Sequence, residues 1–142
     1  MAKIIVPTAT GVNSYGENRD CTVRALANCT GMVYGNAHDI LRKHGRKDKR
    51  GCTHHVWHDA YTNNGMSLIG VYGKTHRSRS LARELAVVAQ DGITLGRLIP
   101  SLTKGSYIVI ITGHALAVVD CNIVDMNFNR SNSRVIAVYK HS

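Results

Sequence analysis

Long apolar runs are missing from this chain of 142 residues. The longest, such as residues 107–111, have only the length of a strand, so we expect no membrane-spanning segment. The apolar stretch at residues 1–6 is far shorter than the apolar core of a signal peptide, which predicts no secretory leader. Together these two absences favour a cytoplasmic location.

Aromatic and acidic residues are also scarce. Phe128 is the only phenylalanine and Trp57 the only tryptophan, so a base-stacking platform for nucleic acid is not expected. The chain has nine acidic residues and 18 Lys and Arg residues, which gives a net charge of +9. Such a charge favours an anionic partner: nucleic acid, an acidic protein surface or an acidic membrane face. It does not exclude an enzyme.

Paired CxxC cysteines are absent as well. The four cysteines, at positions 21, 29, 52 and 121, are scattered and form no dense framework. We interpret them as free thiols in a reducing compartment, with a disulfide pair as the less favoured alternative.

The residues that are present predict one α+β domain spanning 1–142. Apolar residues make up 44% of the chain, which is enough to build a core. Apolar spacing and capping residues predict helices at 20–30, 34–44, 53–63 and 94–102, the last damaged by Pro100. Alternating runs predict strands at 4–6, 66–72, 107–112, 115–119, 123–126 and 135–139. Residues 8–19, 46–50 and 74–80 are expected to be loops, and 81–89 fits helix or strand. N-terminal helices should therefore pack on a C-terminal antiparallel sheet.

Cys21 lies in the first turn of a predicted helix, with Asp20 as its expected N-cap. The unpaired N–H groups and the dipole of a helix N-terminus favour a thiolate, which is the nucleophilic form of cysteine. Cys29 lies near the other end of this helix and Cys121 in a turn, so neither has this advantage. The alternative is that Cys21 is a small buried apolar residue.

His114 and Asp125 are expected to lie close together. Asp120-Cys121 can form a two-residue hairpin turn, which would pair Val119 with Asn122 and Leu116 with Asp125. Asp125 would then share a face with His114, one diagonal step away, and could orient its imidazole. Asp120 is a rival for this role. Asp125 could instead be a solvated carboxylate at a strand end.

Three segments of the chain belong together in one further interpretation. They are Asn18-Arg19-Asp20-Cys21-Thr22-Val23-Arg24-Ala25-Leu26, Gly113-His114-Ala115-Leu116-Ala117-Val118-Val119-Asp120 and Val124-Asp125. These segments resemble the small papain-like cysteine peptidase-related proteins of bacteriophages. That family is similar in layout to the bacteriocin-processing peptidases. The resemblance implies a papain-like cysteine-hydrolase fold over residues 18–138, with Cys21 as nucleophile, His114 as base and Asp125 as orienting carboxylate. It also implies an amide side chain at the oxyanion, matched by Asn18 or alternatively Asn13. A phage-encoded protein would work in the host cytoplasm.

A second group of chemically active residues lies at Cys52, His54, His55 and His58. His54 and His58 are spaced i, i+4, which suits a metal, although no Glu follows His54 as it does in zinc proteases. Exposed histidines at a helix start, with Trp57 as an apolar anchor, are the simpler interpretation, so no metal or other cofactor is predicted.

Two basic runs, from Arg42 to Arg50 and from Lys74 to Arg83, could converge on one phosphate-binding face.

Two functions follow from the sequence. The first is a cysteine hydrolase acting on amide bonds of a peptide or protein, including isopeptide bonds. The second is a non-catalytic basic effector on the same scaffold, which binds a host protein or a nucleic acid.

Overall fold

The computed structural model describes residues 4–5, 19–47, 50–125 and 131–142. Within these residues, five α-helices accompany one six-stranded sheet, which confirms the α+β class. The helices are α2 (Cys21–Thr30), α3 (Tyr34–Lys43), α4 (His54–Thr62), α5 (His76–Glu84) and α6 (Leu95–Leu98), the last continued by a 3-10 turn at Ile99–Ser101. The strands are β1 (Ile4–Ile5), β2 (Met66–Val71), β3 (Ser106–Ile111), β4 (His114–Val119), β5 (Asn122–Val124) and β6 (Val135–His141).

The sheet has the strand order β1-β5-β4-β3-β6-β2. Five strands are antiparallel, and β1 adds to β5 in parallel at one edge, which confirms the short edge strand expected at the N-terminus. The expected order of helices followed by sheet is only partly right. β2 arises between α4 and α5 and pairs with β6 at the far edge, so the sheet gathers strands from three parts of the chain.

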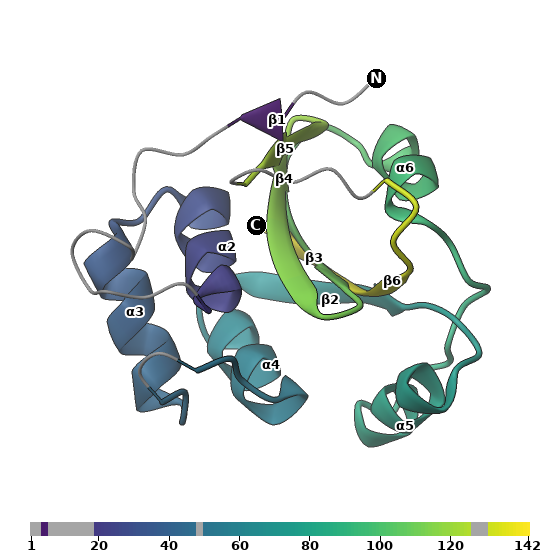
Figure 1. Ribbon diagram of the computed structural model, residues 1–142, viewed down its shortest axis with the longest axis horizontal. Helices are drawn as coiled ribbons and strands as arrows, with labels where there is room; N and C mark the ends of the chain where they lie inside the picture. Colours follow the sequence, from purple (N-terminus) through teal and green to yellow (C-terminus); the bar gives the residue numbers. More distant parts are fainter. Residues whose placement is uncertain (1–3, 6–18, 48–49, 126–130) are drawn as a thin grey trace.

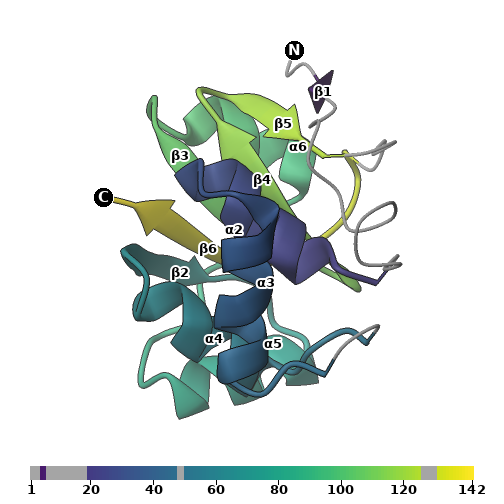
Figure 2. The same cartoon turned by 90° about the vertical axis from the view of Figure 1, so that its left-hand side faces the viewer.

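Helices cover the sheet on both faces (Figure 1). α2, α3 and α4 lie on one side and α6 on the other, and Figure 2 shows α2 and α3 in front of the sheet. Side chains of strand β4 point alternately to the two faces of the sheet and so pack in both apolar clusters. Ala115 and Ala117 belong to the apolar cluster under α2, whereas Leu116 and Val118 belong to the cluster with α6. The two alanines leave room for α2 to pack close to the strand that carries His114.

Residues 74–80 are not the loop that the sequence predicted. Helix α5 begins at His76, because the Thr75 side chain accepts a hydrogen bond from the Ser78 backbone N–H and caps the helix. Ser78, Leu81 and Ala82 then form a buried stripe at helical spacing. The helix ends at Glu84, so only the first four of the undecided residues 81–89 are helical.

No helix within the described residues is long and apolar enough to cross a membrane.

Candidate active site

Helix α2 begins at Cys21, as the sequence predicted, and places the thiol in its first turn. The helix ends at Gly31, whose φ of +81° and N–H bond to Ala27 O form the expected C-terminal cap. Asp20 precedes the helix but its side chain does not cap it. The Asp20 carboxylate instead accepts hydrogen bonds from Tyr34 Oη, at 2.7 Å, and from Arg24 Nε, at 3.0 Å.

The hairpin between β4 and β5 forms through Asp120-Cys121, as predicted. Both residues have positive φ, 48° and 66°, and the turn pairs Val119 with Asn122. Because β5 then runs back along β4, the residue after β5 returns to the beginning of β4. Asp125 thereby reaches His114, the first residue of β4.

His114 and Asp125 form a direct hydrogen bond. His114 Nε2 lies 2.5 Å from Asp125 Oδ2, and the Asp125 side chain is only 3% exposed. The other carboxylate oxygen, Oδ1, accepts a bond of 2.6 Å from Arg24 Nη1. Both oxygens of Asp125 are therefore held, and the carboxylate fixes the plane and tautomer of the imidazole.

The predicted contact of His114 with Asp125 is confirmed. Both side chains also interact with α2: Asp125 accepts a hydrogen bond from Arg24, and His114 interacts with Cys21. His114 begins β4 and Asp125 lies just beyond the end of β5, so the ends of two neighbouring strands meet at the start of α2.

The Cys21 thiol and the His114 ring both line the same pocket and interact electrostatically. Since Nε2 of His114 is used by Asp125, Nδ1 is the ring nitrogen left for the thiol. Burial acts to raise the pKa of Cys21, but the hydrogen bond and charge of His114, the Ala115 backbone N–H and the charge of Arg24 lower it overall. Burial acts to lower the pKa of His114, whereas its bonds to Asp125 and Cys21 raise it to about 9. The two shifts together favour transfer of the thiol proton to the ring.

Arg24 is the supporting residue that sequence reasoning missed. It lies one turn into α2 and bridges the carboxylates of Asp20 and Asp125, so it ties the start of the helix to the end of β5. The i, i+4 spacing of Asp20 and Arg24 was visible in the sequence. Its link to Asp125, 101 residues away, was not.

The remaining candidates of the site are placed as follows. Asn18, with its alternative Asn13, lies outside the described residues. Asp120, the rival orienter, accepts a hydrogen bond of 3.1 Å from the Gly105 N–H at the other end of β4 and takes no part. The Cys21 backbone N–H, at the first residue of the helix, has no acceptor within the helix.

All four cysteines are free thiols, and at Cys21 the interactions with His114 and Arg24 outweigh burial and lower the pKa. Cys29 is buried against Met66, and burial raises its pKa to about 12. Cys52 donates to Thr22 Oγ1 at 3.3 Å, and its pKa is raised, mainly by burial. Cys121 is directed at Leu102 O, 3.6 Å away.

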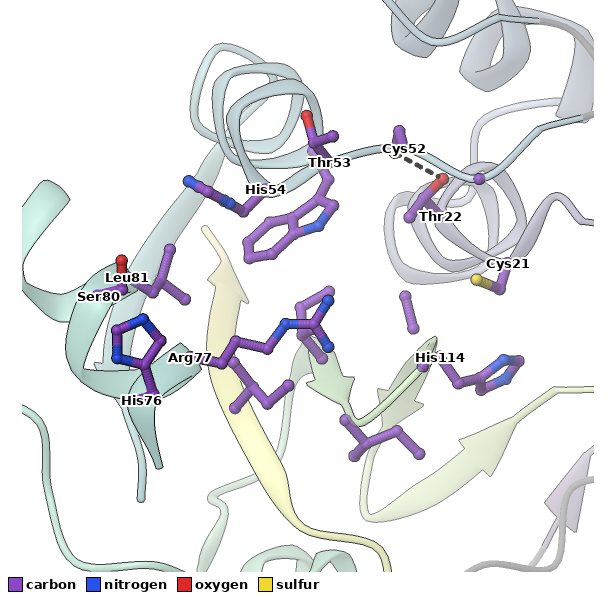
Figure 3. Close-up of a pocket in the computed structure, with 17 residues that line it drawn as sticks. Cys21, Thr22, Cys52, Thr53, His54, His76, Arg77, Ser80, Leu81 and His114 are labelled. Atoms are coloured by element: carbon purple, nitrogen blue, oxygen red, sulfur yellow. Dashed lines mark hydrogen bonds between the residues drawn. The ribbon is translucent and has the colours of Figure 1, made fainter. Parts of the chain in front are cut away.

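A pocket of about 500 Å³ opens beside the Cys21–His114 pair (Figure 3). Both residues line it, and Arg77 enters from the α5 side. Its larger apolar lining residues are Trp57, Leu81, Ile110, Ile111 and Ile136. No Asp or Glu occurs among the described residues that line it, whereas Arg77, His54 and His76 do. The pocket is therefore largely apolar, carries the positive charge of Arg77, and is lined by the Cys21 thiol.

The metal ligands considered at Cys52, His54 and His58 do not come together. Nδ1 of His58 lies 2.5 Å from the Tyr139 hydroxyl, and Cys52 bonds to Thr22. Among the described residues, the donor atoms that do converge belong to His54, His55 and Glu84, all within 4.8 Å of one another.

The two basic runs approach the same pocket. Gly51 and Cys52, which follow the first run, line one part of it, and His76 and Arg77 of the second run line another. Arg42, Lys43, Arg77 and Arg79 are exposed. Arg46 is the exception, since it is buried and donates to Arg19 O at 3.2 Å.

The described residues thus place a thiol beside an imidazole that is hydrogen-bonded to a carboxylate, at the mouth of a pocket. Searches with this chain find no matching family model, no matching curated protein and no matching solved structure. The chemistry of the site is accordingly inferred from its geometry.

Proposed function

We propose that this protein is a cysteine hydrolase of amide bonds, in which Cys21 is the nucleophile, His114 the acid and base, and Asp125 the orienting residue. One observation carries the proposal: His114 is hydrogen-bonded through one nitrogen to a buried carboxylate and lines the same pocket as a thiol at a helix N-terminus. This is the arrangement that activates a cysteine nucleophile. The open pocket beside the thiol supports catalysis over a purely structural pair.

The reaction follows from the protonation states. The Cys21 thiolate attacks the amide carbon, a C–S bond forms, and the carbonyl electron pair moves to oxygen, which the Cys21 N–H can stabilise. The His114 imidazolium gives its proton to the nitrogen as the C–N bond breaks, which releases the amine and leaves a thioester. Water then attacks the thioester while neutral His114 accepts its proton, and the carboxylic product leaves as the thiolate–imidazolium pair is restored.

The charge of the pocket favours substrates with acidic groups near the scissile bond. In Figure 3 the Arg77 side chain extends into the pocket, toward the side where Cys21 and His114 lie. Apolar side chains around it reduce solvent screening, so a guanidinium–carboxylate pair is stronger there than on an open surface. A peptide with Asp or Glu close to the cleaved bond fits this lining.

The papain-like fold and the phage origin belong to the same proposal. A nucleophile at the start of a helix packed on an antiparallel sheet, with a histidine on one strand and a carboxylate just beyond the next, supports a papain-like layout. The phage assignment, and with it action in the host cytoplasm, depends on the sequence segments around Cys21, His114 and Asp125.

Cleavage of a peptide library, read by mass spectrometry, tests the hydrolase. We expect cleavage that is lost in Cys21→Ala and His114→Ala and retained in Cys121→Ser, because Cys121 lies in the distant β4–β5 turn. Activity that survives Cys21→Ala would contradict the proposal. The proposal would also be contradicted if the protein cleaved no peptide of the library and its Cys21 were no more reactive than Cys29.

A non-catalytic effector is the second candidate, and one observation favours it. Arg79 and Arg83 on α5 are exposed, and no carboxylate in the described part of the chain forms an ion pair with either. An anionic host protein or a nucleic acid could bind this face. Nucleic acid affinity should then fall steeply as salt rises and weaken in Arg79→Gln/Arg83→Gln, while Cys21 alkylation stays unchanged. No binding at low salt would remove nucleic acid as a partner.

A further inference from the structure

Two imidazoles and a carboxylate meet where the N-terminus of α4 approaches the C-terminus of α5. His54 and His55 are the first two residues of α4, and Glu84 is the last residue of α5. His54 Nε2 is in contact with Glu84 Oε2, and His55 Nε2 lies 3.8 Å from the same oxygen. The three donor atoms all lie within 4.8 Å of one another.

We infer that His54, His55 and Glu84 bind a divalent transition-metal ion of the zinc class, which joins α4 to α5. Imidazole nitrogen and carboxylate oxygen both bind zinc at about 2.0–2.2 Å, so two ligands on a tetrahedral ion lie roughly 3.4 Å apart. The separation of His54 Nε2 from Glu84 Oε2 is shorter than this value, and that of His55 Nε2 from Glu84 Oε2 is longer. Small side-chain rotations would bring both separations to this value.

An ordinary ion pair accounts for only part of this arrangement. A Glu84–His54 pair needs one imidazole, yet the His55 ring also turns to the same carboxylate, and its centroid lies 4.1 Å from that of His54. A cation shared by all three side chains explains why both rings converge. The site is open, since the three side chains are 35%, 70% and 42% exposed, which leaves a ligand position for water.

The ion would act on the pocket that holds Cys21. His54 lines that pocket on the α4 side, and the opposite part is lined by His76, Arg77, Ser80 and Leu81 of α5. In Figure 3 the two helices stand at different sides of the cavity. A metal that ties Glu84 to the start of α4 therefore fixes the two helices relative to each other and sets the width of the pocket.

Zinc binding is best measured by calorimetry on the full chain after treatment with EDTA, in a Cys21→Ser background that removes the reactive thiolate as a competing ligand. We expect one equivalent of Zn²⁺ to bind and to raise the melting temperature. Glu84→Gln and His55→Ala should each weaken binding by at least the roughly tenfold loss that even outer-shell changes cause. His76→Ala, which removes an exposed histidine from the other end of α5, is the matched control and should bind like its parent.

Cobalt substitution supplies an independent readout, because cobalt–thiolate bonds give intense near-ultraviolet absorption that imidazole and carboxylate ligands do not. The Co²⁺ complex should lack that absorption. Binding that survives both Glu84→Gln and His55→Ala, or a thiolate spectrum, would overturn the inference. Neither result depends on peptide cleavage, so failure of this site and failure of the proposed hydrolase are distinguishable.

Discussion

His114 connects the whole site, because its ring interacts with two chemically different partners. Nε2 lies 2.5 Å from the buried Asp125 carboxylate, and the ring also interacts electrostatically with the Cys21 thiol. These interactions raise the pKa of His114 to about 9 against the opposing effect of burial. A histidine that stays protonated through neutral pH can both stabilise a thiolate and deliver a proton to a leaving amine.

Replacing Asp125 should therefore lower the pKa of His114. In Asp125→Asn the charge that favours the imidazolium is gone, so the pKa should fall from about 9 toward the ordinary histidine value of about 6.5. NMR titration of the His114 ring measures this shift. Asp120→Asn is the matched control, since Asp120 bonds to Gly105 and should leave the His114 titration in place. An unchanged titration in Asp125→Asn would mean that the carboxylate does not support the ring.

Arg24 should matter for stability as well as for the site. Its side chain is 12% exposed and pairs with Asp20 and Asp125, whose side chains are 2% and 3% exposed. Arg24→Ala leaves two buried carboxylates without this partner, which should lower the free energy of unfolding by about 3 kcal/mol. Urea denaturation measures the change. Arg83→Ala, at an exposed position of α5, should stay within about 0.5 kcal/mol of the wild type. Equal losses of unfolding free energy in Arg24→Ala and Arg83→Ala would show that the bridge made by Arg24 adds nothing to stability.

At the scale of elements, short-range chemistry identified α2 and the β4–β5 hairpin correctly. Gly31 ends α2 as its position predicted, whereas Asp20 precedes Cys21 as expected but does not cap the helix with its side chain. The Asp120-Cys121 turn fixed the register that carries Asp125 back to His114. Helix α5 was missed because its sequence is mostly basic and polar, and its buried stripe is limited to Ser78, Leu81 and Ala82.

The N-cap of α5 offers a test of its local stability. Thr75 accepts the Ser78 N–H with its side chain, whereas Thr53, the N-cap of α4, makes no such bond. Thr75→Ala should therefore cost about 1 kcal/mol of unfolding free energy, and Thr53→Ala should cost clearly less. Thermal or urea unfolding of the two variants makes the comparison. A larger loss in Thr53→Ala would contradict this account of where α5 begins.

The pocket exists only at the scale of the whole molecule. Its lining comes from the start of α2, the segment before and within α4, the first half of α5 and the ends of β3 and β4. Sequence reasoning found the Cys21, His114 and Asp125 series because a helix start and a hairpin register are local. It could not find that Arg77, Trp57 and Ile136 line the same pocket as the thiol, since no short-range pattern brings these elements together. The convergence of His54 and His55 on Glu84 was hidden for the same reason.

The central claim is that His114 keeps Cys21 as a thiolate, and the rate of Cys21 alkylation by iodoacetamide against pH tests it most directly. Thiolate is the reactive form, so a lowered pKa makes Cys21 react at lower pH than an ordinary cysteine does. In His114→Ala burial remains while the interactions with His114 are lost, so the midpoint must move upward. Peptide mapping reads Cys29 in the same samples, and it should react far more slowly because its pKa is about 12. A Cys21 that reacts no faster than Cys29, with a midpoint unaffected by His114→Ala, would contradict the account.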